Sequence, residues 1–215
     1  MNHPLSVVGK LKSRFMPISR GFTLVELMIV MGIVGISVAL AVPIFKTVGE
    51  KREITKAAET IVSFLTLAQS EAVKRNEKVT VSWFTSGGHS SNWCIGATEG
   101  ATACDCKDPD LKTTTCKVED QPFRLAQADF VDKDSEFMHM RVSTGKFAFD
   151  PVRGIITDPS STDIFDPRYI FYIHSEKGSG RSRDYELEIR LNVTGRVYIC
   201  TDLSRQKRIG GYTPC

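Results

Sequence analysis

The sequence predicts an α+β fold in which one long N-terminal α-helix packs on an antiparallel β-sheet head. Three observations lead to this prediction. In this chain of 215 residues, an apolar run extends from Phe22 to Phe45, and a helical periodicity follows it as far as about Asn76. Alternating patterns separated by turn residues occupy most of the rest of the chain. The part after the apolar run is long enough for one globular domain with a modest core.

The apolar run is long enough to cross a membrane. Phe22 to Phe45 is 24 residues with a single ionisable side chain, Glu26, and as a helix it would be roughly 36 Å long, against a hydrocarbon core of about 30 Å. The 21 residues before it hold no acid and four basic residues, Lys10, Lys12, Arg14 and Arg20. This charge predicts a cytoplasmic leader and a translocated remainder. A secretory signal would have a shorter apolar region, followed by its cleavage site.

Two residues within the run are unusual. A carboxylate in a membrane helix costs on the order of 2–3 kcal/mol on insertion scales, so Glu26 is expected to have a partner or a function. The alternative is a plain membrane anchor in which Glu26 only reaches toward the interface. Pro43 removes a backbone hydrogen bond and is expected to kink or loosen its turn, which a single-pass anchor would also tolerate.

The junction between leader and apolar run reads Arg20-Gly21-Phe22-Thr23-Leu24-Val25-Glu26. It resembles the processing site of type IV prepilins and pseudopilins. The resemblance implies that a prepilin peptidase cleaves between Gly21 and Phe22 and that Phe22 becomes N-methylated. It also implies that Glu26 pairs with the N-terminal amine of a neighbouring subunit, and that the helix stretches or melts at Pro43 inside a filament.

Charge argues against a general affinity for nucleic acids. The chain has 28 basic and 25 acidic residues, but loss of the leader leaves 24 basic residues and a net charge of −1. The basic character of the whole chain therefore belongs to the leader. No nucleophile-and-base motif, phosphate loop or metal signature occurs in the sequence, so an enzyme is not expected and no cofactor is predicted.

The cysteines predict disulfides. An even number of cysteines in a translocated domain is typical of an oxidising compartment. Cys200 and Cys215 would most simply close a C-terminal loop, and the other four are expected to form two bridges within a loop rich in Gly, Thr and Asp: Cys94, Cys104, Cys106 and Cys116. Zinc is the alternative, but Cys-x-Cys is not the usual ligand spacing and only His89 is nearby.

Periodicity defines the elements after the apolar run. Apolar residues from Ile54 to Ala72 recur every three or four positions, which predicts an amphipathic helix that ends near Asn76. The segment 185–191 alternates apolar and charged residues, so one face is expected to be buried and the other solvated. Strands are predicted at 79–84, 93–95, 123–131, 138–143, 146–149, 154–157, 169–174, 185–191 and 196–200.

The second half carries a narrower resemblance. The helix end Leu67–Asn76, the segment Phe147–Pro151 with Gly154, and the segment Gly195–Cys200 resemble landmarks of the GspH/FimT/FimU family of minor pilins and pseudopilins. The resemblance implies a cleaved leader at 1–21, a transmembrane half-helix at 22–45, an amphipathic half-helix at 46–77, and a periplasmic head at 78–215. The head would carry a cysteine loop at 94–116 and a C-terminal loop at 200–215.

The family resemblance implies a structural and interaction protein. It would be a single-pass inner-membrane protein that enters the pilus and helps to initiate pilus assembly, in a tip complex. Its partners would be the prepilin peptidase, the major pilin, other minor pilins and the inner membrane. A minor pseudopilin of a type II secretion system is an alternative function.

A DNA-binding minor pilin for natural transformation is the other alternative. Some members bind DNA through a Gly-Arg-x-Arg motif near the C terminus. Here Gly180-Arg181-Ser182-Arg183 lies on a different hairpin, and Gly195-Arg196-Val197-Tyr198 has tyrosine in place of the second arginine. Arg181, Arg183 and Arg196 are therefore the candidate DNA contacts, and solvated basic loops that pair with local acids are the other interpretation.

Overall fold

The computed structural model describes residues 21–86, 92–130, 138–141, 145–158, 169–176, 183–201 and 208–215. The chain forms two compact units, residues 1–44 and residues 45–215. Helix α1 (Leu24–Arg75) begins in the first unit and ends in the second.

The first unit contains the apolar start of α1. Every described residue from 21 to 40 is exposed. The window Leu24–Ala41 has a mean hydropathy of 2.4 and is 0% buried, so by length and composition it is able to cross a membrane. The helix start is capped by Thr23, whose hydroxyl oxygen accepts a hydrogen bond from the Glu26 N–H at 3.2 Å.

In the second unit, α1 presents one buried stripe. Its members recur at three- and four-residue steps and are at most 2% exposed: Ile54, Ala57, Ala58, Ile61, Leu65, Ala68 and Ala72. The helix ends at Arg75 because Asn76 adopts a left-handed conformation with φ of 54°, which asparagine tolerates better than most residues. The predicted end near Asn76 is confirmed.

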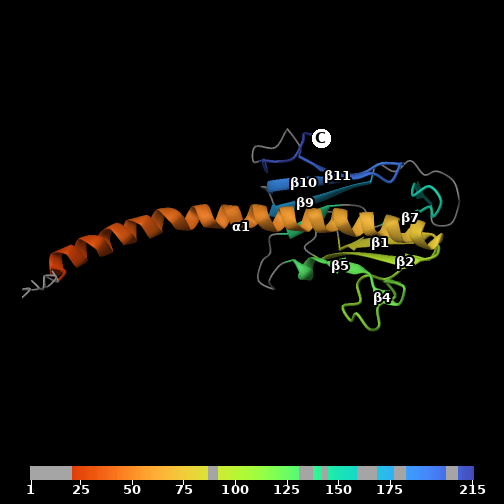
Figure 1. Ribbon diagram of the computed structural model, residues 1–215, viewed down its shortest axis with the longest axis horizontal. Helices are drawn as coiled ribbons and strands as arrows, with labels where there is room; N and C mark the ends of the chain where they lie inside the picture. The colour runs from red at the N-terminus through yellow and green to blue at the C-terminus, as the bar shows by residue number, and fades with distance from the viewer. Residues whose placement is uncertain are drawn as a thin grey trace, which may run out of the picture. The chain divides into compact units, whose positions relative to one another are not determined.

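Two antiparallel sheets follow α1 (Figure 1). The first has the order β5-β2-β1-β7-β8: Arg124–Ala126, Trp93–Glu99, Val79–Thr85, Gly145–Phe149 and Ile156–Thr157. The second has the order β11-β10-β9-β6: Val197–Cys200, Arg183–Leu191, Tyr169–Glu176 and Met138–Arg141. A short hairpin pairs β3 (Lys117–Val118) with β4 (Gln121–Pro122).

The buried stripe of α1 and residues from both sheets form one core. In Figure 1, β9, β10 and β11 lie on one side of the second half of α1, and β1, β2 and β5 lie on the other. Trp83 of β1 joins the sheets, since its ring lies 5.7 Å from Phe147 of β7 and 5.2 Å from Phe171 of β9, between centroids. Fully burying one such side chain contributes about 1.5–3 kcal/mol. The predicted α+β class is confirmed.

Two predictions about strands were wrong. The strand expected at 123–131 is only β5, because a 3₁₀ turn, η1 (Gln127–Asp129), follows it. The Asp129 carboxylate accepts a hydrogen bond from the Ala126 N–H at 2.6 Å and holds this turn. The strand expected at 154–157 begins only at Ile156, because Gly154 has φ of 63° and lies in the preceding turn.

The expectation of a solvated face on β10 was also wrong. Glu186 and Glu188 are 3% and 5% exposed. At Glu188 the disulfide near the C terminus lies over this face, since the sulfur atoms of Cys200 and Cys215 lie within 4.8 Å of a Glu188 carboxylate oxygen. Arg190 stabilises that carboxylate with hydrogen bonds of 2.9 and 3.1 Å.

Candidate functional site

The predicted cleavage site lies outside regular structure. Gly21 and Phe22 precede α1, and Phe22 is 82% exposed. A side chain placed on Gly21 would meet no atom within 4 Å. Because a peptidase must draw the scissile bond into its own site, an exposed bond before a capped helix is geometrically suited to cleavage.

Glu26 lies in the first turn of α1 among exposed apolar side chains. A carboxylate here interacts favourably with the helix dipole, but an apolar medium would still leave it in need of a cation. No ion pair joins Glu26 to another residue in the described parts of the chain. Its neighbours are 56–75% exposed: Leu24, Val25, Leu27 and Met28. The pairing of Glu26 with the N-terminal amine of a neighbouring subunit stays a prediction.

Helix α1 continues through Pro43. The Pro43 side chain lies outside the described side chains. The predicted loosening of the helix at Pro43 stays a prediction.

The three landmark segments of the sequence meet at one junction in the head. Gln69 of α1 donates a hydrogen bond from Nε2 to the Gly154 carbonyl oxygen at 2.7 Å. Gly154 lies in the turn between β7 and β8, and Gly195, with φ of 77°, lies in the turn between β10 and β11. A Cβ on Gly195 would overlap both the Gly154 carbonyl oxygen and the Gln69 amide. The junction therefore joins α1 to the turns of both sheets.

A charged cluster at the end of α1 was not found from the sequence. The Arg75 guanidinium donates to Glu71 at 2.7 Å, Glu99 at 2.9 Å and Glu119 at 2.6 Å. The hydrogen bond from Arg75 lowers the pKa of Glu71, and the hydrogen bonds to Glu71 and then Glu119 raise the pKa of Arg75. The sequence shows only that Glu71 and Arg75 are four residues apart, a spacing at which side chains on a helix are neighbours.

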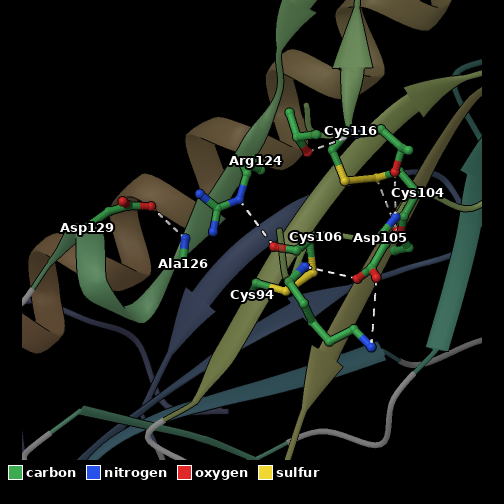
Figure 2. The surroundings of a disulfide bond; sticks show 12 residues. Cys94, Cys104, Asp105, Cys106, Cys116, Arg124, Ala126 and Asp129 are labelled. Carbon is green, nitrogen blue, oxygen red and sulfur yellow. Dashed lines mark hydrogen bonds and ion pairs between the residues drawn. A yellow bond between two sulfur atoms is a disulfide. The ribbon is translucent and has the colours of Figure 1, made fainter. Parts of the chain in front are cut away.

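Two interlaced disulfides hold the cysteine loop against the first sheet. Cys94 is bonded to Cys106, and Cys104 to Cys116 (Figure 2). All four cysteines are buried. A Cβ on Gly96 of β2 would overlap the Cys116 sulfur, so only glycine fits beneath this bridge. Because all four sulfur atoms are in disulfide bonds, none of these cysteines is a thiolate that could bind zinc.

Acidic residues shape the same loop. Asp105, Asp108 and Asp110 each accept a hydrogen bond from the main-chain N–H two residues later, at 2.9–3.0 Å. The Thr113 hydroxyl donates to Asp108 at 2.7 Å and lowers the pKa of that carboxyl. These are Asx turns, which hold the chain between the two bridges. The carboxylates thus have a structural role within the loop.

A third disulfide, Cys200–Cys215, closes the C-terminal loop. Glu188, Cys200 and Cys215 lie close enough together to resemble a metal site, but both sulfur atoms are in the bridge. Ile209 is 5% exposed and belongs to the core. The Tyr212 hydroxyl donates to Glu59 of α1 at 2.9 Å. Burial, and then this hydrogen bond, raise the pKa of Tyr212.

The candidate DNA contacts lie only partly within the described residues. Arg196 is exposed beside β11. Arg181 lies outside the described residues, and so does the side chain of Arg183. His89 also lies outside them, whereas His174 of β9 is fully buried. DNA binding through Arg181, Arg183 and Arg196 stays a prediction.

Comparison with known proteins gives two matches to families. The family described as type II transport protein GspH matches residues 57–195, which is more than half of the chain. The prokaryotic N-terminal methylation motif matches residues 16–42. The first match contains Gln69, Gly154 and Gly195, and the second contains Gly21 and Glu26.

Individual relatives match shorter segments. The pilin-like protein PilA1 of Thermus thermophilus is 37% identical over 68 residues, which are 32% of this chain and 42% of that protein. A fimbrial protein of Pseudomonas aeruginosa is 35% identical over 65 residues, which are 30% of this chain and 42% of that protein. The chain thus spans less than half the length of these curated relatives.

A solved structure covers more of the chain at lower similarity. The crystal structure of the type IV minor pilin FimU of Pseudomonas aeruginosa covers 70% of this chain and 90% of its own, with a TM-score of 0.38 and 13% identity. The assignment rests on the two family matches, which together cover the N-terminal motif, the second half of α1 and most of the head. The chain belongs to the GspH family of type IV pilin-like minor pilins and pseudopilins, and it carries the prokaryotic N-terminal methylation motif.

Proposed function

We propose that this chain is a minor type IV pilin that helps to initiate pilus assembly and stays in a tip complex. It is cleaved between Gly21 and Phe22 by the prepilin peptidase and N-methylated at Phe22. Residues 22–45 hold it in the inner membrane with its head in the periplasm until it enters the pilus. The supporting observation is an exposed Gly21–Phe22 junction before a capped apolar helix, in a chain whose head matches the GspH family.

Glu26 supplies the contact between subunits in this proposal. Cleavage creates a new amine at Phe22, and an apolar environment strengthens the attraction between an amine and a carboxylate. The Glu26 carboxylate has no ion-pair partner within the described chain. Pairing with the Phe22 amine of a neighbour would neutralise both charges and set the axial register of adjacent helices.

The head supplies contacts with the major pilin and other minor pilins. Among the described residues, three disulfides hold the cysteine loop and the C-terminal segment, and the Gln69–Gly154 hydrogen bond holds the turn after β7. A surface held in this way loses little conformational entropy when it binds. That property suits a subunit whose role is to hold neighbours in place.

Mass spectrometry of the N terminus tests the processing step. Chain isolated from membranes should begin at N-methylated Phe22, and chain from cells without prepilin peptidase should keep residues 1–21. Glu26→Gln should leave cleavage unchanged, because it removes the charge without altering Gly21 or Phe22. A chain that keeps its leader in cells with active peptidase would refute the proposal.

A minor pseudopilin of a type II secretion system is the second candidate. The description of the matching family, type II transport protein, favours it. Cleavage and N-methylation at Phe22 are expected for both functions. A test that distinguishes them must therefore measure surface pili and secreted proteins. In this second case, loss of the chain would lower the level of secreted proteins and leave surface pili unchanged.

A further inference from the structure

The outer edge of the second sheet is formed by β11, and half of its peptide groups point away from β10. Tyr198 lies opposite Arg190, and the Asn192 N–H donates to the Arg196 carbonyl oxygen at 3.2 Å. Hydrogen-bonded pairs alternate along an antiparallel ladder, so residues 196, 198 and 200 bond to β10. The N–H and carbonyl groups of Val197 and Ile199 therefore point outward.

The C-terminal segment already uses this edge at one position. Thr201, the next residue that points outward, donates its N–H to the Thr213 carbonyl oxygen at 3.0 Å and accepts from the Cys215 N–H at 3.1 Å. It forms an isolated parallel bridge with Pro214. The side-chain hydroxyl of the preceding Tyr212 donates to Glu59 of α1. Within the described segments, β10 is the only strand that pairs with β11.

A groove runs beside the outward-facing groups. It has a volume of about 380 Å³ and is lined by Asn192, Arg196, Tyr198, Ile199 and Thr213. The Arg196 side chain is exposed, and it forms no ion pair with any residue that the structure describes. The groove thus combines main-chain donors and acceptors with a guanidinium that is able to bind a carboxylate.

We propose that the β11 edge is a docking site for an extended, acidic segment of a neighbouring subunit, which adds to the second sheet as a further strand. This inference rests on the proposed role as a filament subunit. Addition of a strand obtains affinity from main-chain hydrogen bonds and specificity from side chains that alternate along the strand. Arg196 selects a segment with Asp or Glu facing it. Thr201 and Thr213 limit the site at one end, so only a short strand fits.

The test uses the full-length chain in cells that need it for piliation. Thr213, which is exposed and lines the groove, is replaced by the photo-crosslinking residue p-benzoylphenylalanine. Leu111 in the cysteine loop, which is 52% exposed, is the matched control position. Illumination should join position 213, but not position 111, to another pilin subunit. Mass spectrometry should locate the crosslink in an extended segment that contains an acidic residue.

Variants at the edge examine the mechanism. Ile199→Pro removes one outward N–H, at a place where an edge strand tolerates proline. It should lower the crosslink yield about five-fold, the loss expected for one main-chain hydrogen bond, whereas Ile199→Val should not. Arg196→Glu should abolish the crosslink and Arg196→Lys should preserve it. The amount of chain in the cells and an intact Cys200–Cys215 bridge show whether each variant is folded. If Ile199→Pro fails to fold, the comparison of Arg196→Glu with Arg196→Lys still tests the proposal.

Three outcomes would overturn the proposal. One is the absence of a crosslink from position 213 in cells that need the chain for pili, which removes the docking site and leaves the proposed function intact. Another is a crosslink whose yield is unchanged in Arg196→Glu, since this excludes the predicted charge pairing. The third is normal piliation without the chain, which refutes the proposed function and the docking site together.

Discussion

Gly195 is a residue whose replacement the head should tolerate poorly. It needs φ of 77°, and a Cβ there would overlap the Gly154 carbonyl oxygen and the Gln69 amide. A left-handed residue with a side chain costs about 1–2 kcal/mol and overpacking about 1–3 kcal/mol. Gly195→Ala should therefore lower the free energy of unfolding by about 2–5 kcal/mol. Urea unfolding followed by the fluorescence of the buried Trp83 and Trp93 measures this change.

Gly210→Ala is the matched control for this substitution. Gly210 is exposed, and a Cβ there would meet no atom within 4 Å. Its effect should stay within about 0.5 kcal/mol. Equal effects at the two glycines would show that the junction of Gln69, Gly154 and Gly195 does not hold the head together.

Arg75 gives a prediction about pH. Its hydrogen bond lowers the pKa of Glu71 from 4.5, so the stability gained from this pair is present above pH 4.5 and is lost as the pH falls through the lower pKa of the folded state. Arg75→Gln should lower the melting temperature at pH 7. The difference from the unmodified protein should narrow at acid pH, because the carboxylates become protonated in both proteins.

Lys74→Gln is the control for Arg75. The Lys74 side chain is 67% exposed and lies 3.6 Å from Glu71, so its ion pair should contribute little. Thermal unfolding from pH 7 to pH 3 compares the two variants. A constant difference between Arg75→Gln and the unmodified protein across this range would contradict the role assigned to the charged cluster.

At the level of elements, α1 could be predicted because its signals are local. The buried stripe from Ile54 to Ala72 follows the helix period, and Asn76 ends the helix by its own backbone preference. The Asx turns of the cysteine loop are equally local, because each joins a carboxylate to the main-chain N–H two residues later. The helix period, the helix end and the Asx turns each depend on residues only a few positions apart, so the sequence is sufficient to predict such features.

The features that sequence reasoning missed depend on distant contacts. Glu186 and Glu188 alternate with apolar residues as solvent-facing side chains do, yet both are buried, and the sulfur atoms beside Glu188 belong to residues 12 and 27 positions later, Cys200 and Cys215. The Arg75 cluster joins residues 24 and 44 positions apart. The division of the strands into two sheets also depends on pairing partners that no local pattern specifies.

The C-terminal loop gives a prediction at this same scale. The Cys200–Cys215 bridge has a sequence separation of 15, and closing a loop of this size contributes about 3 kcal/mol on the entropic account. Replacing both cysteines with serine should lower the free energy of unfolding by about this amount. It should also speed hydrogen exchange in β11, where Thr201 holds the C-terminal segment. Unchanged exchange would mean that Ile209 and Tyr212 suffice to hold it.

For the whole molecule, the two family matches cover different parts of the chain with different expected roles. The methylation motif covers residues 16–42, where processing and membrane insertion are expected, and the GspH match covers residues 57–195, where the head is built. A motif of few residues specifies processing, so sequence alone identified Gly21, Phe22 and Glu26 as candidates. Contacts with other subunits depend on surfaces such as the β11 edge, which only a folded structure displays.

A count of surface pili by electron microscopy, in cells that lack this chain, directly tests its proposed role in pilus assembly. Few or no pili are expected in these cells. The full chain should restore pili, whereas Glu26→Gln should be processed but should fail to restore them. Normal piliation in cells without the chain would contradict the account, and would direct the next measurements to secreted protein levels and transformation frequency.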